Sequence, residues 1–86
     1  MKKKRITISR SDAVYAIGIV SKLLDIPEWT LRNIEKEGLI QPKRMNKKIR
    51  FYSMEDMEKL EYIHFLMYEK GVNISGIKII MERDEE

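Results

Sequence analysis

A chain of 86 residues has room for one small domain, which excludes a large enzyme with a deep cleft between two domains. Its 43% apolar and 36% charged residues indicate a globular protein and exclude a disordered tail or a membrane protein. The absence of cysteine excludes disulfides and cysteine nucleophiles, and the single histidine cannot build a zinc site. We therefore expect no metal, no cofactor and no enzymatic activity.

The sequence predicts no membrane partner. Residues 13–21 form the longest stretch without a charge, which is far shorter than the roughly 20 apolar residues of a membrane span. The basic residues 2–5 resemble the start of a signal peptide, but Arg10 and Asp12 interrupt any apolar core that would follow. We therefore expect a cytoplasmic protein.

Positive and negative charges are distributed unevenly along the chain. The formal net charge is +3, but residues 1–50 hold 13 Lys and Arg against 5 Asp and Glu, whereas residues 51–86 hold 4 against 9. Residues 41–53 contain five cations, two aromatic residues and no acid. Such a cluster is typical of a surface that faces a polyanion, because each cation near a phosphate releases a condensed counterion. The alternative is a merely solvated loop.

The first part of the chain predicts an arm and two short helices. Residues 1–12 are basic and lack a sustained period, which predicts a flexible arm. A short helix with Gly18 as its N-cap is expected next, and its apolar stripe comprises Ile19, Val20, Leu23 and Leu24. Pro27 suits the first position of a second helix, and Gly38 suits its end. Two short helices joined by a tight turn predict a helix-turn-helix.

The second helix is expected to have one face towards the core and one face exposed to solvent. Leu31 and Ile34 point towards the core, while residues at i, i+4 and i+7 point away from it: Trp29, Asn33 and Lys36. An exposed Trp either faces a groove of DNA or covers a neighbouring side chain or a dimer contact. Thr30 and Arg32 flank this stripe, and both residue types commonly hold phosphates. Asn33 could pair with an adenine edge.

Residues 39–52 predict a hairpin of two short extended segments with a cationic tip at residues 45–48. The tip contains no Asn-Gly or Asp-Gly pair, so we expect a loop longer than a two-residue primed turn. A helix-turn-helix followed by a basic hairpin predicts a winged helix. In that arrangement the second helix enters a major groove and the hairpin, or wing, follows the adjacent backbone.

Two further helices complete the predicted fold. Ser53 and Asp56 predict a capping box at the start of a longer helix, whose buried stripe comprises Met57, Leu60, Ile63, Leu66 and Met67. Three aromatic residues widen the stripe and predict that this helix is covered on more than one side: Tyr62, Phe65 and Tyr68. His64 beside the stripe is expected to be partly buried and structural.

The last helix is expected to begin after Asn73 or Ser75, and its apolar face comprises Ile74, Ile77, Ile80 and Met81. The fold class is therefore mainly α, a winged helix-turn-helix with two short helices, a small basic β-hairpin wing and two further helices. The expected domain covers residues 13–83, between the basic arm (residues 1–12) and an acidic end (residues 84–86).

Over residues 15–81 the chain resembles the N-terminal DNA-binding domain of MerR-type bacterial regulators. The matching positions, in order and spacing, are Tyr15, Ala16, Ile17, Thr30, Leu31, Arg32, Glu35, Gly38, Leu39, Ile40, Pro42, Arg44, Ile49, Arg50, Tyr52, Ser53 and Leu60. Residues 71–78 are similar to the Gly-hydrophobic-Asn-hydrophobic-small-Gly stretch of the heat-shock repressors of the HspR type.

The resemblance implies a transcriptional regulator that represses heat-shock and chaperone genes. It implies a homodimer on an inverted-repeat operator of double-stranded DNA, at the nucleoid when bound, with an Hsp70-type chaperone as a possible co-repressor. In the family, residues matching Thr30, Arg32, Arg44, Arg50 and Tyr52 lie against DNA. The complete predicted DNA-binding set is Trp29, Thr30, Arg32, Asn33, Lys36, Lys43, Arg44, Lys47, Lys48, Arg50 and Tyr52.

The chain also departs from the family pattern. Asn33 and Ile34 stand where the family usually has Tyr, Asp25 replaces a Gly between the first two helices, and Lys47 and Lys48 replace a Gly at the wing tip. The chain stops where relatives continue into a dimerising coiled coil, so it is either a truncated DNA-binding domain or a small protein that dimerises differently. Two alternatives remain: a MerR-like protein-interaction module that binds chaperones, and an excisionase-type architectural DNA-binding protein.

Overall fold

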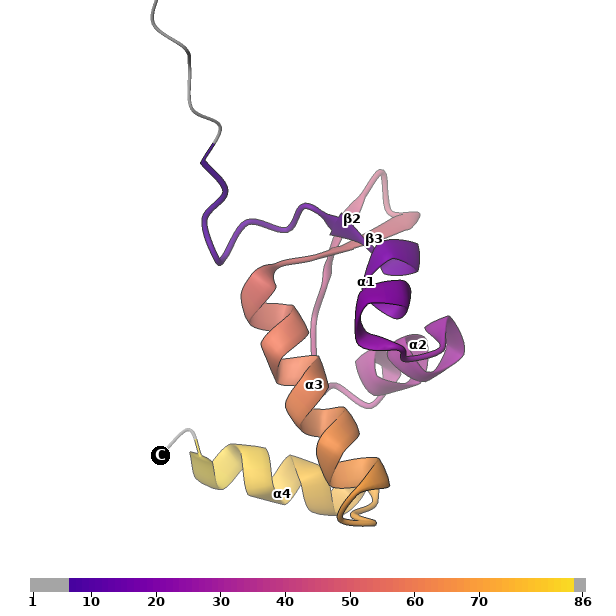
Figure 1. Ribbon diagram of the computed structural model, residues 1–86, viewed down its shortest axis with the longest axis vertical. Coiled ribbons are helices and arrows are strands. Elements are labelled where there is room, and N and C mark those ends of the chain that lie inside the picture. The colour runs from indigo at the N-terminus through magenta and orange to yellow at the C-terminus, as the bar shows by residue number, and fades with distance from the viewer. Residues whose placement is uncertain (1–6, 85–86) are drawn as a thin grey trace, which may run out of the picture.

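The computed structural model describes residues 7–84. The elements of this part follow one another as β1 (Tyr15–Ala16), α1 (Ile17–Leu24), α2 (Glu28–Lys36), β2 (Lys43–Met45), β3 (Ile49–Tyr52), α3 (Met54–Tyr68) and α4 (Ile74–Asp84). Figure 1 shows a small sheet at one end, α1 and α2 beside α3, and α4 crossing the far end of α3. The prediction of a mainly α winged helix-turn-helix is confirmed.

The turn between α1 and α2 is held by Ser21 and Asp25. The Ser21 hydroxyl donates to the Ile26 carbonyl at 2.6 Å, and Asp25 adopts a left-handed conformation with φ of 55°. The first helix begins slightly earlier than expected, because its N-cap is Ala16 and not Gly18. Pro27 is the N-cap of α2 and not its first residue.

Only one side of α1 reaches the core. Val20 is buried and Leu24 is half-buried, whereas Ile19 and Leu23 are exposed. The prediction of one apolar stripe along this helix is therefore only half correct. A helix of eight residues contacts the core along a narrow line, and Ile19 and Leu23 lie one position before the two residues on that line.

The end of α2 is a Schellman motif. Gly38 has φ of 80°, its N–H donates to the Glu35 carbonyl, and the Leu39 N–H donates to the Ile34 carbonyl. Ile34 and Leu39 are both buried, so the apolar contact that accompanies this motif is also present. The expected role of Gly38 as the helix terminator is confirmed, and the chain leaves α2 in the direction of the wing.

The wing is part of a three-stranded antiparallel sheet with the order β1-β3-β2. Tyr15 pairs with Tyr52 in β3, which places the segment before α1 against the wing. The sequence did not predict β1, because a strand of two residues is too short to show a period.

The wing tip combines a three-residue loop with a primed-type turn. The strands pair up to Met45 and Ile49, so residues 46–48 form the loop, as the expectation of a longer connection required. Asn46 and Lys47 nevertheless both have positive φ, and the Lys48 N–H donates to the Met45 carbonyl at 3.1 Å. This is the pattern of a type I′ turn, which here lies within the longer loop. Asn tolerates this conformation better than Lys does.

Replacing Lys47 tests this backbone conformation. We expect Lys47→Gly to have a free energy of unfolding about 1 kcal/mol higher than Lys47→Ala, because only glycine adopts positive φ without a steric penalty. Both variants lose the same charge, so chemical denaturation of the pair isolates the backbone term. Equal stabilities would show that residue 47 does not hold positive φ in solution.

The start of α3 is capped from two directions. The Ser53 hydroxyl accepts from the Asp56 N–H, and the Asp56 carboxylate accepts from the Ser53 N–H, which confirms the predicted capping box. The Arg10 carbonyl also accepts from the Glu55 N–H at 3.1 Å, and the Arg10 side chain pairs with Glu58.

Residues 1–6 of the predicted arm lie outside the described residues. Arg10, in its last third, is bonded to α3.

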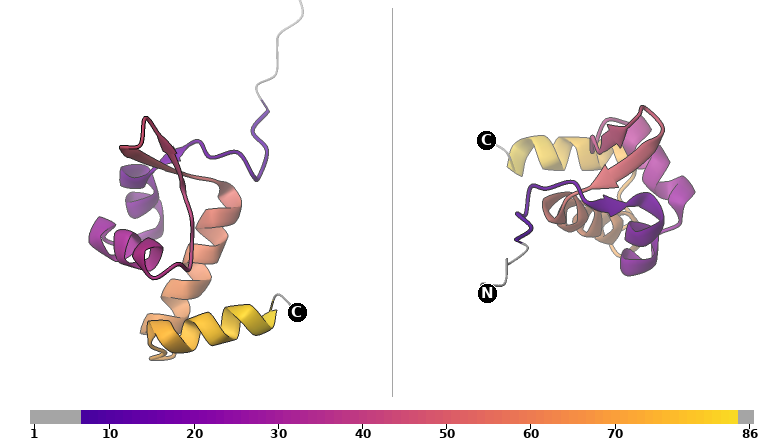
Figure 2. Two further views of the ribbon diagram at one scale, coloured as in Figure 1. Left: turned by 180° about the vertical axis from the view of Figure 1, so that it is seen from behind. Right: turned by 90° about the horizontal axis from the view of Figure 1, so that it is seen from above.

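The core lies between α1, α2 and α3, with one contribution from α4. Its fully buried apolar side chains include Val20, Ile26, Leu31, Ile34, Tyr52, Leu60, Ile63 and Ile77. Asn73 caps α4, because its side chain accepts from the Gly76 N–H at 2.8 Å. The left view of Figure 2, from behind, shows that α4 lies at the opposite end of α3 from the sheet.

The aromatic side of α3 is exposed. Tyr62, Phe65 and Tyr68 are 40%, 42% and 57% exposed, so the prediction that this helix is covered on more than one side is wrong for the chain as described. Half-buried His64 packs against Tyr68 with ring centroids 4.4 Å apart and the rings tilted by 41°, in keeping with a structural histidine. No helix in residues 7–84 has the length and apolar character needed to cross a membrane.

Candidate nucleic-acid interface

One face of α2 carries exposed side chains suited to contact DNA. Trp29 is 66% exposed, so it does not fold back over a neighbour, and Asn33 and Lys36 are exposed on the same side. Arg32 is exposed and pairs with Glu28 one turn earlier, with 3.0 Å between its Nη2 and the carboxylate oxygen. A surface pair of this kind holds the guanidinium only weakly, so Arg32 can exchange its partner.

The wing carries the second group of cations. Lys43 and Arg44 lie on β2, Lys47 and Lys48 lie in the tip, and Arg50 lies on β3. The lysines are exposed and project from a thin hairpin, while Arg50 is half-buried. Arg44 and Arg50 are direct partners across the two strands.

Glu35 connects the wing to α2. One oxygen of its carboxylate accepts from Arg44 Nη2 at 3.0 Å, and the other accepts from Arg50 Nε at 2.5 Å. These side chains line a hollow of about 450 Å³ together with Arg32 and Lys36, so four cations and one carboxylate face the same space. The structure therefore brings together four of the predicted residues, two from α2 and two from the wing.

The charge state of Glu35 follows from its neighbours. Burial alone would raise the pKa of its carboxyl group, but the hydrogen bonds and charges of Arg50 and Arg44 outweigh this effect and hold the pKa below its usual range. Because the folded pKa is lower than the unfolded one, the pairing stabilises the fold above the unfolded pKa. This contribution is lost as the pH falls through the folded pKa.

Thr30 and Tyr52 do not lie where the prediction put them. Thr30 is 2% exposed and Tyr52 is 0% exposed, and both polar side-chain atoms are buried as well. Neither side chain can reach DNA from this position, so their expected direct contact with DNA is corrected here to a role inside the core. Thr30 precedes Ile34 by one helical turn, and Tyr52 lies where β3 meets α3.

The buried phenol of Tyr52 predicts a loss of stability in alkali. Burial raises the pKa of Tyr52 to about 12, and the negative charge of Glu35 adds to this effect. The stabilisation is complete below the unfolded pKa of about 10 and is lost as the pH rises towards the folded pKa, by at most roughly 2–3 kcal/mol.

The measurement is the free energy of unfolding between about pH 8 and about pH 12 for the wild type, Tyr52→Phe and Tyr68→Phe. The wild type and Tyr68→Phe should lose stability in parallel, because Tyr68 is exposed. Tyr52→Phe should have a flatter profile. Three parallel profiles would contradict ionisation of a buried Tyr52.

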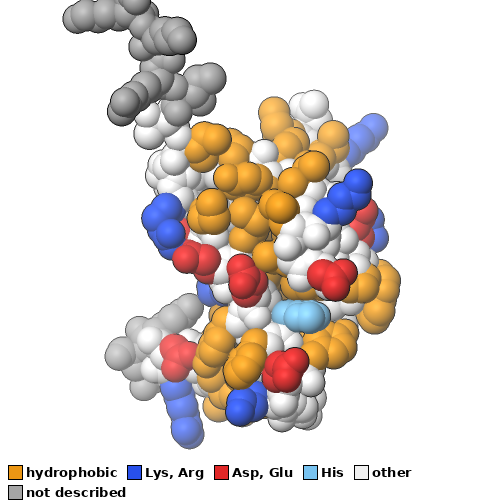
Figure 3. Space-filling model, viewed as in Figure 1, with side chains coloured by type: hydrophobic (Ala, Val, Ile, Leu, Met, Phe, Trp, Pro, Cys, Tyr) orange, Lys and Arg blue, Asp and Glu red, His pale blue; other side chains and the backbone are white. Residues whose placement is uncertain are grey.

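One face of the molecule shows acidic and hydrophobic side chains together. On the face in Figure 3, Asp and Glu side chains are spread across the middle of the molecule, and Lys and Arg lie mainly around its edge. Hydrophobic side chains gather above the acids on this face.

Sequence reasoning did not include Glu35 among the functional residues. Two signals were available in the sequence. Glu35 lies within one turn of Arg32 on α2, and the wing contains no acid that could neutralise its own arginines. The exposed apolar side chains of Met45 and Ile49 on the wing were also missed.

Residues 15–84 match the family model described as MerR HTH family regulatory protein. The chain belongs to the MerR family. The match covers both helices of the helix-turn-helix, the wing, α3 and α4, so it confirms the resemblance stated from the sequence.

Curated relatives agree with this assignment to the MerR family. The chain is 32% identical over 79 residues to a Streptomyces coelicolor protein that carries the name heat shock protein HspR, covering 92% of this chain and 52% of that protein. It is 33% identical over 72 residues to the transcriptional regulator GlnR of Bacillus anthracis and of Bacillus cereus, covering 84% of this chain and 55% of those proteins. The chain thus spans about half the length of these relatives.

Proposed function

We propose that this MerR-family chain binds double-stranded DNA, with α2 in a major groove and the wing along the adjacent phosphate backbone. The observation that supports this proposal is the shared hollow in which Arg32 and Lys36 of α2 meet Arg44 and Arg50 of the wing. Phosphate contacts from such cations position a protein on the duplex, and side chains on the groove-facing helix read base edges. Asn33 and Trp29 are the exposed candidates for base contact.

The regulatory role is proposed from the relatives. The protein named HspR and the similar segment at residues 71–78 support repression of heat-shock and chaperone genes at an inverted repeat, with one copy of the chain on each half-site. An Hsp70-type chaperone is proposed as co-repressor. Selection from a random pool tests the operator, since a dimer should recover two inverted half-sites spaced by one or more helical turns. Single half-sites would contradict the dimer.

The test of DNA binding is a titration of a random-sequence duplex at two salt concentrations. We expect affinity to fall steeply with salt, because each phosphate that the protein neutralises releases a counterion. Asn33→Ala should change the preference among selected sequences and leave binding to the random duplex nearly unaltered. Affinity that is independent of salt would contradict the proposal.

A protein-interaction module is the second candidate function. The observation in its favour is the exposed aromatic side of α3, where Tyr62, Phe65 and Tyr68 could contact a partner protein. A chain that acts only in this way should show no steep, salt-dependent association with DNA, so the same titration separates the two candidates.

A further inference from the structure

We infer that Glu35 is a positioning residue for DNA binding, because its carboxylate holds Arg44 and Arg50 side by side with donors left over for phosphate. This inference rests on the proposed function. It predicts the opposite of simple charge counting, in which removal of an acid from a DNA-facing surface strengthens binding. The two expectations differ in sign, so one experiment can decide between them.

The strand register creates the need for such a residue. Arg44 and Arg50 lie directly opposite each other in the hairpin, and like charges in directly opposite positions repel. Glu35 accepts one hydrogen bond from each guanidinium, with separate oxygens, at 3.0 and 2.5 Å. Its side chain is only 16% exposed, so salt screens these pairs less than it screens pairs on the surface. The carboxylate therefore offsets the repulsion and fixes both side chains.

The pairing leaves both arginines able to bind an anion. A guanidinium has five N–H donors, and the bonds to Glu35 use Nη2 of Arg44 and Nε of Arg50. The hollow around them contains four cations and one carboxylate, so its charge stays positive. Both arginines have also lost rotamer freedom before DNA arrives, which lowers the cost of ordering them on binding.

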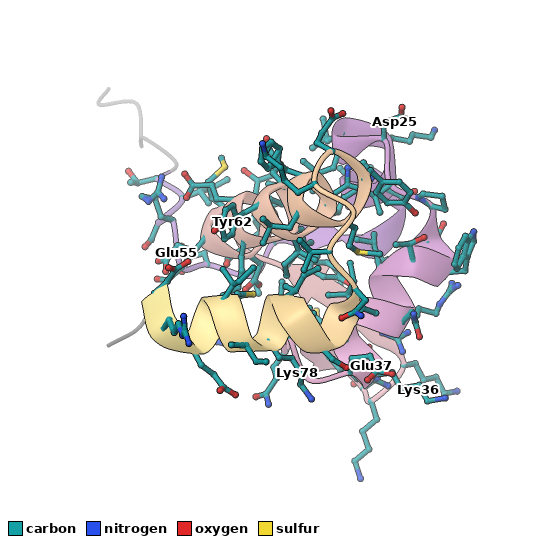
Figure 4. All side chains as sticks on the ribbon, turned by 90° about the horizontal axis from the view of Figure 1, so that it is seen from below. Asp25, Lys36, Glu37, Glu55, Tyr62 and Lys78 are labelled. Carbon is teal, nitrogen blue, oxygen red and sulfur yellow. The ribbon has the colours of Figure 1, made fainter. Side chains whose placement is uncertain are left out.

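The matched control is Glu37, two residues further along the chain, which is the C-cap of α2. Figure 4 shows Lys36 and Glu37 projecting from the end of this helix, and Glu37 makes no side-chain bond within residues 7–84. Glu35→Gln and Glu37→Gln remove the same charge from positions two residues apart, one in the last turn of α2 and one at its C-cap. Against a random-sequence duplex, we expect Glu37→Gln to bind slightly more tightly than the wild type and Glu35→Gln to bind about fivefold more weakly.

A second comparison uses a chain that lacks both arginines. In an Arg44→Ala/Arg50→Ala background, Glu35 has nothing to position and only repels phosphate, so Glu35→Gln should strengthen binding there. The reversal of sign is the signature of a positioning role. A Glu35→Gln effect of the same sign in both backgrounds overturns the inference.

Each outcome is informative. A wild type without salt-dependent DNA binding overturns the proposed function and this inference together. A wild type that binds, with a Glu35→Gln variant that binds equally well or better, overturns only the role of Glu35. Circular dichroism reports whether the variant is folded. If Glu35→Gln is unfolded, the test uses Glu35→Asp, which keeps the charge but has a shorter side chain. Weaker DNA binding by Glu35→Asp supports the positioning role, and unaltered binding overturns it.

Discussion

Replacing Arg50 with alanine is expected to weaken binding to every duplex, by about tenfold at physiological salt, and to lower the salt slope by about one. The loss has two parts. One phosphate contact from the wing disappears, and Glu35 keeps only Arg44 as a partner, so its charge is less neutralised and repels the DNA backbone. The measurement is a gel-shift or anisotropy titration at several salt concentrations with random and selected duplexes.

The control for this variant is Arg83→Ala. Arg83 is exposed on α4, at the far end of α3 from the wing, and its removal changes the net charge by the same amount. It should alter affinity only slightly. If Arg50→Ala binds as the wild type does with an unaltered salt slope, the wing does not contact phosphate and the docking proposed for α2 and the wing is wrong.

Replacing Leu60 with alanine should have the largest effect on stability. Leu60 is fully buried on α3, and removing such a side chain costs about 2–5 kcal/mol because apolar burial is lost and a cavity remains. Phe65 on the same helix is 42% exposed, so Phe65→Ala should cost less than about 1 kcal/mol despite the larger side chain. Denaturant unfolding of both variants gives the comparison.

The ratio of these two effects also tests the exposed aromatic side of α3. If Phe65→Ala destabilises as much as Leu60→Ala, and if its effect grows with protein concentration, the aromatic side is covered by a second copy in solution. If the effect of Phe65→Ala is small at all concentrations, the exposure seen in the single chain also holds in solution.

Local signals predicted the ends of the helices well. Gly38 ends α2 because a left-handed residue is required there, and Ser53 with Asp56 starts α3 because the two residues satisfy each other's backbone donors. Both motifs are confined to a few consecutive residues, so they can be recognised without knowledge of any distant contact. The same locality explains why the order of helices and wing could be predicted without a structure.

Contacts between segments that are distant in the chain could not be predicted from the sequence. Strand β1 exists because residues 15–16 meet β3, and Glu35 became part of the site because the wing folds back over α2. The burial of Thr30 had a local signal, since Thr30 and Ile34 lie one turn apart on the same side of α2. The family resemblance suggested DNA contact and outweighed that helical geometry.

The junction between β3 and α3 joins the wing and the long helix α3 into one rigid unit. Strand β3 ends at Tyr52 and α3 begins at Met54, so a single residue, locked in a capping box, separates them. With Tyr52 anchored in the core, no hinge lies between them. The 15 residues of α3 extend about 22 Å from the wing to α4. If the wing rotates when it docks, this rigid junction predicts that α3 tilts with it and that α4, at its other end, is displaced.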